Sequence, residues 1–228
     1  MQALRVALLG LVLSGCESVD DVVAKRRAGV EKTFAALSAL APKVKDAPLP
    51  SRVAALEVPL VLESGGKGES NAMFVYAADL AKPGAAAPVN LRTLDSVPLL
   101  QCGSLLEKKV YFGNPPSRPV PSVTGQYLAA CERLRYALVI REVAFVEPKL
   151  QLELRHFDKG RLDLEVLAFD LTNGALVGGY AVSATNDEKI DLLDADPNHL
   201  RRILQNLESA TWDALRAGAK TTFPGSLP

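Results

Sequence analysis

The stretch Arg161-Leu162-Asp163-Leu164-Glu165-Val166 alternates charged and apolar residues, and this alternation decides the fold class. Successive side chains of a β-strand point to opposite faces of the sheet, so the apolar residues share one face and the charged residues the other. The same alternation runs through Leu150–Arg155, and Asp158-Lys159-Gly160 separates the two stretches. The sequence therefore predicts an antiparallel hairpin that turns at residues 158–160 and has one buried face and one wet face.

Further strands extend this hairpin into a meander. A β-rich run covers Tyr136–Val146, and Asn173-Gly174, a strong hairpin signal, leads into Ala175–Thr185. A final helix is predicted to begin at Asp196-Pro197 and to end at Gly218, with an apolar stripe that can cover the sheet. We predict an α+β fold: a mainly antiparallel sheet formed by a C-terminal meander, packed by helices and preceded by an N-terminal helix.

The middle of the chain carries weaker signals. Val53–Glu63 is β-rich and can pair with Ala72–Ala77 around a glycine-rich turn, although Pro59 cannot donate to a ladder. Short helices are predicted at Val97–Leu106 and Gln126–Leu134. The glycines at 65–68 do not have the spacing of a phosphate-binding loop, so we interpret them as a turn.

Composition argues against some partners. Lys plus Arg and Asp plus Glu number 26 each, and aromatic residues make up only 6% of the chain. This balance gives no reason to expect a nucleic acid or an acidic polymer as partner. We predict no nucleic-acid partner and no cofactor.

The N-terminus begins with Arg5, an apolar run at Val6–Val12 and the small residues Ser14 and Gly15. This order is typical of a secretory signal, and the run is far shorter than the roughly 20 apolar residues of a membrane-spanning helix. Leu13-Ser14-Gly15-Cys16 matches the pattern Leu-(Ala/Ser)-(Gly/Ala)-Cys, so the chain resembles the bacterial lipoproteins through their lipobox.

The resemblance implies that residues 1–15 are a signal peptide, cleaved between Gly15 and Cys16, and that Cys16 is acylated. Two or three acyl chains hold a protein stably on a bilayer. In enteric members of this class Asp after the cysteine favours the inner membrane, whereas this chain has Glu17. We therefore expect a lipid-anchored protein of the cell envelope, on the periplasmic face of the outer membrane rather than on the inner membrane.

Four segments follow from these signals. Behind the signal peptide, residues 16–50 are predicted to hold the lipidated Cys16, a helical stalk over Ser18–Ala41 and the stiff linker Ala47-Pro48-Leu49-Pro50. Residues 51–220 would form the α+β periplasmic domain, and residues 221–228 a loose tail. The basic run Lys25-Arg26-Arg27 is either a solvated helix face or a contact for anionic headgroups.

With Cys16 lipidated, Cys102 and Cys131 remain, an even number in an oxidising compartment. We predict a disulfide between them; two free buried thiols are the alternative. On the chain-entropy model, a bridge that closes a loop of this length stabilises a fold by roughly 3 to 4 kcal/mol.

Residues with catalytic or metal-binding chemistry are few. His156 and His199 have no partner at a metal-ligand spacing, so we predict no metal site and no catalytic residue. Carboxylates cluster at Asp163 and Glu165, and again before the last helix at Asp187, Glu188, Asp191, Asp194 and Asp196. Paired carboxylates can hydrolyse glycosides or hold calcium, but the spacing here favours solvated side chains.

Two functions remain from the sequence. The first is a non-catalytic envelope lipoprotein that binds a protein, a cell-wall component or an assembly partner, and we favour it because no catalytic set is apparent. The alternative is a periplasmic hydrolase of envelope polymers that uses the paired carboxylates of the meander and the acidic loop.

Overall fold

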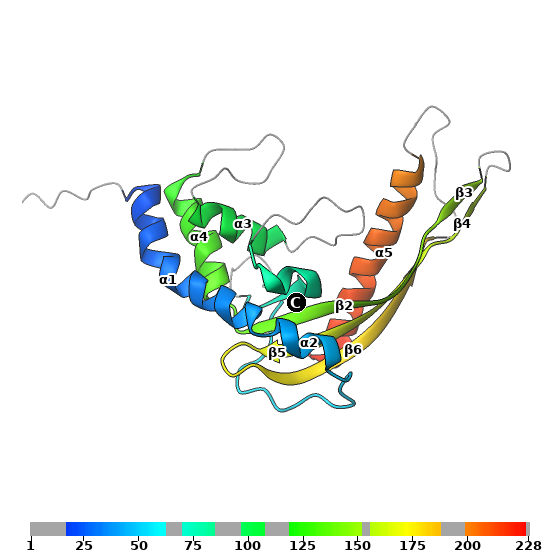
Figure 1. Ribbon diagram of the computed structural model, residues 1–228, viewed down its shortest axis with the longest axis horizontal. Helices are drawn as coiled ribbons and strands as arrows, with labels where there is room; N and C mark the ends of the chain where they lie inside the picture. The colour runs from blue at the N-terminus through cyan, green and yellow to red at the C-terminus, as the bar shows by residue number, and fades with distance from the viewer. Residues whose placement is uncertain are drawn as a thin grey trace, which may run out of the picture.

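The structure, a computed structural model, describes residues 17–62, 70–84, 97–107, 119–151, 156–187 and 199–226. Its centre is a four-stranded sheet in the order β1-β2-β5-β6 (Figure 1). The antiparallel strands are β2 (Tyr136–Val146), β5 (Arg161–Asp170) and β6 (Ala175–Thr185), while β1 (Ala72–Tyr76) runs parallel to β2. The predicted α+β class with a mainly antiparallel meander is confirmed.

The meander follows the predicted alternation, but its first turn differs. Val146 pairs with Arg161, and beyond it β3 (Lys149–Gln151) pairs with β4 (His156–Asp158). The chain therefore reverses between residues 151 and 156, and the predicted turn at 158–160 is wrong. Lys159 and Gly160 instead lie between β4 and β5, and the Gly160 amide donates to Asn186 Oδ1 at 2.8 Å. Alternation shows which residues share a face, but it does not identify the partner strand.

The predicted hairpin between Val53–Glu63 and Ala72–Ala77 is also not formed. Residues 53–62 contain no strand, and β1 pairs with β2 instead. Their backbones bond at one end, where the amides of Asn71 and Ala72 donate to the carbonyl of Val61 at 3.0 and 3.1 Å. Pro59, which cannot donate, is compatible with this irregular segment.

In the part of the chain that the structure describes, five helices cover one face of the sheet. They are α1 (Val19–Ser38), α2 (Ala41–Asp46), the 3-10 helix η1 (Ala77–Ala81), α3 (Val97–Leu106) and α4 (Pro121–Glu132). Fully buried residues of this layer, which we call the helical face, include Val30 and Leu37 of α1, packed in one core with Val139 and Leu167 of the sheet. The prediction of a helical stalk over Ser18–Ala41 is therefore wrong, because the apolar residues of α1 are part of the domain core.

The proline segment after α2 is part of the domain as well. Pro50 and Leu49 lie against Gly179 of β6, and the Ala54 amide donates to the Val177 carbonyl at 2.7 Å. The segment therefore wraps around one edge of the sheet instead of linking two parts.

The opposite face, which we call the α5 face, is covered by α5 (His199–Thr222) and by residues 53–62. Leu215, Ala219 and Phe223 pack against the apolar residues of β5 and β6. The predicted start at Asp196-Pro197 lies outside the described residues. Gly218 does not end the helix; a Cβ there would lie 2.3 Å from the Tyr180 ring, so glycine permits close packing.

The predicted tail at 221–228 is ordered as far as residue 226. Phe223 is 3% exposed and Ser226 is fully buried. The Ser226 carbonyl accepts from the Leu62 amide at 2.8 Å, and the Ser226 hydroxyl donates to the Ala219 carbonyl at 3.2 Å. These bonds fix the chain end to the α5 face, so the prediction of a loose tail is wrong for these residues.

Candidate functional site

Gly15 and Cys16, the residues of the predicted cleavage and lipidation site, lie outside the described residues, which begin at Glu17. From there the chain enters α1 through a capping box. The Ser18 hydroxyl accepts from the Asp21 amide at 3.2 Å, while the Asp21 carboxylate accepts from the Ser18 hydroxyl and amide. The hydrogen bond from the Ser18 hydroxyl lowers the pKa of the Asp21 carboxyl most, and the bond from the Ser18 amide lowers it further. The capping box thus fixes the start of α1 two residues after Cys16.

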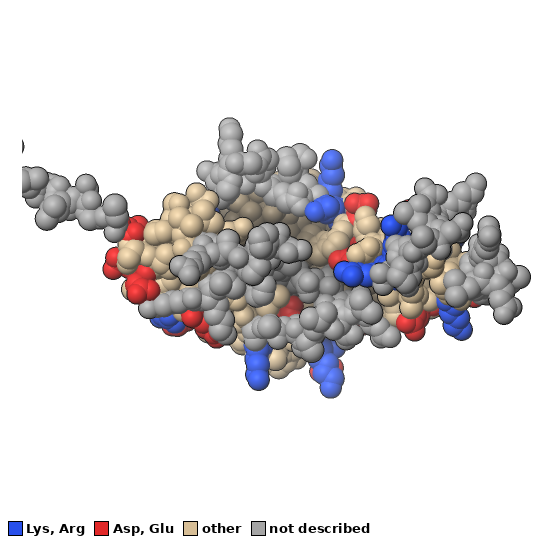
Figure 2. Space-filling view, turned by 90° about the horizontal axis from the view of Figure 1, so that it is seen from above, with Lys and Arg blue, Asp and Glu red and all other residues tan. Residues whose placement is uncertain are grey.

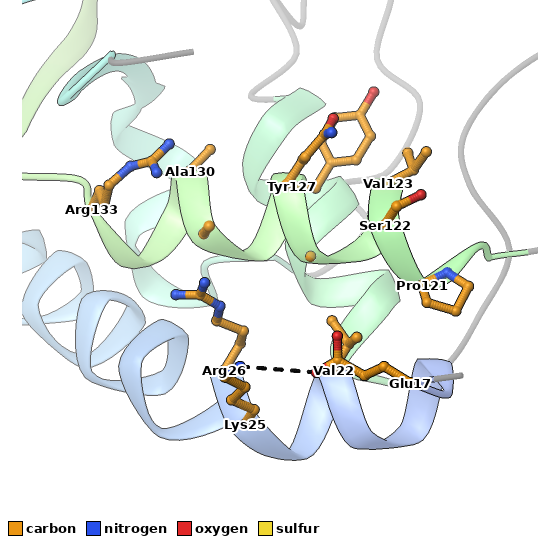
Figure 3. Close-up of a pocket in the computed structure, with 13 residues that line it drawn as sticks. Glu17, Val22, Lys25, Arg26, Pro121, Ser122, Val123, Tyr127, Ala130 and Arg133 are labelled. Carbon is orange, nitrogen blue, oxygen red and sulfur yellow. Dashed lines mark ion pairs between the residues drawn. The ribbon is translucent and has the colours of Figure 1, made fainter. Parts of the chain in front are cut away.

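A groove of about 840 Å³ opens between α1 and α4 at this end of the domain (Figure 3). Val22 of α1 lies next to Gly125 of α4, and Ala129 and Ala130 of α4 add further small apolar residues to the lining. Its charged and polar lining comes from both helices: Glu17, Lys25, Arg26, Ser122, Gln126 and Arg133. We call this feature the α1/α4 groove.

Apolar side chains continue from the groove onto the surface of α4. Val120 is 51% exposed, Val123 37% and Tyr127 44%. Val123 and Tyr127 line the groove itself, and Figure 3 shows them on the upper side of α4. Exposed apolar side chains beside a groove are typical of a binding surface.

The basic run 25–27 mostly serves the fold. Arg26 pairs with Glu132 of α4. Arg27 donates to the Leu106 carbonyl at the end of α3 at 2.7 Å and pairs with Glu31 at 3.2 Å. Lys25 lies at the groove, 3.9 Å from Glu17 (dashed line in Figure 3). The run is therefore neither a plain solvated face nor a free cationic patch.

Acidic residues gather where α1 begins. Glu17, Asp20 and Asp21 are all exposed, and Figure 2 shows Asp and Glu side chains at this end of the molecule. Three carboxylates at the start of the helix are favourable to its dipole. They also make this end a poor match for an anionic surface.

Cys102 of α3 and Cys131 of α4 are brought together, with their sulfur atoms 2.02 Å apart. Both residues are 1% exposed. The pair joins α3 to the helix that forms one wall of the groove. The other wall, α1, approaches α4 closely: a Cβ on Gly29 would lie 2.4 Å from the Glu132 carboxylate.

The carboxylates of the meander are each held by an arginine. Arg161 donates to Asp163 at 2.6 to 3.0 Å, and Arg141 donates to Glu165 at 3.0 Å through Nε. The hydrogen bonds from Arg161 lower the pKa of Asp163 most, and a hydrogen bond from the Ser183 side chain lowers it further. A general acid of a glycosidase needs the opposite shift.

The other candidate groups remain separate. Asp187 exchanges hydrogen bonds with the Asn206 side chain, while Glu188, Asp191, Asp194 and Asp196 lie outside the described residues. His156 lies in β4 and His199 begins α5. Within the part of the chain that the structure describes, no group of three His, Cys, Asp or Glu residues could hold a metal ion.

Sequence reasoning did not find the groove. Its walls lie about 100 positions apart in the chain, and no local pattern specifies that α1 packs against α4. No helix within the described ranges is both long and apolar enough to cross a bilayer. No protein family, curated protein or solved structure matches this chain.

Proposed function

We propose that this protein is a lipid-anchored envelope lipoprotein with a non-catalytic binding or accessory role in the periplasm, held on the outer membrane by acyl chains on Cys16. The observation that carries the proposal is the lipobox Leu13-Ser14-Gly15-Cys16 directly after an apolar run. A protein partner or a cell-wall component would bind at the α1/α4 groove, whose lining begins at Glu17, the residue after the anchor.

The groove suits binding better than catalysis. Its lining combines apolar and charged residues, and the described residues that line it include no histidine and no cysteine. Such a surface buries apolar area while its polar groups fix the orientation of a partner.

A partner fits the groove better than anionic headgroups do. Arg26 and Arg27 already bind Glu132 and the α3 carbonyl, and three carboxylates surround the start of α1. Juxtamembrane lysines and arginines attract anionic lipid by about 1 kcal/mol each, and here the nearby acidic residues offset that attraction.

The anchor is tested by fractionating cells that produce Cys16→Ser, with Ser14→Ala as the matched control because the lipobox pattern accepts alanine there. We expect the control protein in the membrane fraction with incorporated labelled palmitate. The Cys16→Ser protein should carry no palmitate label, and no processed form of it should be found in the membrane fraction. Palmitate label on Cys16→Ser would contradict the proposal.

The binding role is tested by a photo-cross-linking residue in the full chain, in intact cells. Gln126 lies in the groove, and the exposed Ser209 of α5 provides the control on the other face. We expect a specific cross-link from Gln126 that disappears when Ala130→Trp fills the groove, and none from Ser209. Equal products from both positions would contradict a role for the groove.

A further inference from the structure

β6 forms one border of the sheet and pairs with β5 on its inner side only (Figure 1). The Asn186 amide donates inward to the Gly160 carbonyl at 3.3 Å. Antiparallel strands alternate between residues that bond inward and residues that bond outward. Counting back from Asn186, the amides and carbonyls of Thr185, Ser183 and Ala181 therefore point away from β5.

The first part of this outer edge is closed by the proline segment. Ala54 bonds to the Val177 carbonyl, and Pro50 lies beside Gly179. Beyond that point the edge is open: Ala181, Ser183 and Thr185 are exposed, and no backbone group in the described ranges bonds to their outer side. We call residues 181–185 the open edge.

The open edge lacks the usual protection. Sheet borders are normally blunted by charged residues, proline or bulges, because unpaired amides and carbonyls are a template for another strand. Gly179–Thr185 contains no charged residue and no proline, and the bulge of β6 lies earlier, opposite Ala168/Phe169.

We propose that the open edge pairs antiparallel with the open edge of a second copy of this chain, so that the two sheets become continuous across a two-fold axis. Ser183 would face its own counterpart, and Ala181 would face Thr185 of the other copy. In this register every outward residue meets an outward residue, and three such pairs give about six hydrogen bonds.

A second copy fits because the edge is self-complementary. The side chains along it are small and uncharged, so no like charges meet across the axis. The open edge lies opposite three charged residues of β5, and each is paired within the domain: Arg161 with Asp163, and Glu165 with Arg141. The pairing depends on the fold and not on the acyl chains, so it can fail or hold independently of the proposed function.

Cross-linking tests the register. In a hydrogen-bonded antiparallel pair the facing Cα atoms lie about 5.5 Å apart, which is within disulfide range. Chain with Ser183→Cys, oxidised in isolated membranes, should give a band at twice the apparent mass of the same protein after reduction, and this band should disappear on reduction. Ala175→Cys, an exposed position on the same strand outside the open edge, should give none.

Sedimentation of the purified full chain in detergent separates pairing from misfolding. Ser183→Lys places like charges opposite each other and should weaken the dimer about fivefold or more. Ser183→Ala removes only the side-chain bond to Asp163 and should leave the dimer unchanged, with circular dichroism confirming the fold of both. A monomeric unmodified chain, or a Ser183→Cys cross-link only to a protein of another mass, would overturn the proposal.

Discussion

The two faces of the sheet are covered by different means. On the helical face, short helices from distant parts of the chain are joined by specific links: the Cys102–Cys131 pair, the Arg26–Glu132 ion pair and close glycine contacts. On the α5 face a single helix of 24 residues packs large side chains against the strands. The helical face therefore adds a covalent and an ionic link between its helices. On the α5 face, apolar packing is joined by the close Gly218–Tyr180 contact and by the bond from the Tyr180 hydroxyl to the Leu215 carbonyl.

The largest effect is expected from a cavity on the α5 face. Leu215 is fully buried there, so Leu215→Ala should lower the free energy of unfolding by about 2 to 5 kcal/mol. Leu200→Ala, on the same helix but 41% exposed, provides the control and should change it by less than about 0.5 kcal/mol. Urea denaturation measures both; equal effects would mean that α5 does not pack as described.

Loss of the cysteine pair should act on the helical face alone. Replacing Cys102 and Cys131 together by alanine should lower the free energy of unfolding by about 3 kcal/mol. Hydrogen exchange should then rise in α3, α4 and α1 while β5 and α5 keep their protection. A uniform rise over both faces would show that the pair stabilises the whole domain and not one layer.

Two glycines of the helical face should respond in opposite directions. A Cβ on Gly103 would lie 2.1 Å from the Gly84 carbonyl oxygen, so Gly103→Ala should destabilise by about 1 to 3 kcal/mol. A Cβ on Gly125 would meet only Val22, at 3.5 Å. Gly125→Ala should therefore stabilise by up to about 1 kcal/mol through helix propensity. Thermal unfolding compares them, and destabilisation by both would contradict the assigned contacts.

Acid should weaken a polar link on the α5 face. Burial acts to raise the pKa of Asp170, but hydrogen bonds from Thr172 and Arg135 outweigh it and leave the pKa below its usual value. A lowered folded pKa gives stability that is present above the unfolded pKa of about 3.9 and lost as pH falls through the folded pKa. Asp170→Asn should thus be less stable than the parent at pH 7, and the gap should narrow below pH 4. A gap that is constant with pH would contradict this.

Local patterns predicted one part of the fold well. The bounds of β2, β6 and α3 are confirmed, because alternation, the Asn173-Gly174 turn and helix periodicity all act over a few residues. The parallel pairing of β1 with β2 joins residues more than 60 positions apart, and no local pattern specifies it. The same holds for Ser226, whose burial depends on Leu62.

Only those parts of the candidate site that depend on a local motif or on a residue count could be predicted from the sequence. Cys16 is defined by four adjacent residues, and the cysteine pair follows from a count, so both could be proposed from the sequence. The α1/α4 groove required knowing that α1 packs on α4. Arg26 and Arg27 illustrate the difficulty, since their partners Glu132 and Leu106 lie about 80 to 106 positions away.

The central claim is the lipid on Cys16, and intact mass spectrometry of the protein extracted from membranes tests it most directly. The account predicts a chain that begins at Cys16 and carries the added mass of a diacylglyceryl group, usually with a further acyl chain on its new amino group. A membrane-extracted protein that retains residues 1–15, or that begins elsewhere without added lipid mass, would contradict it.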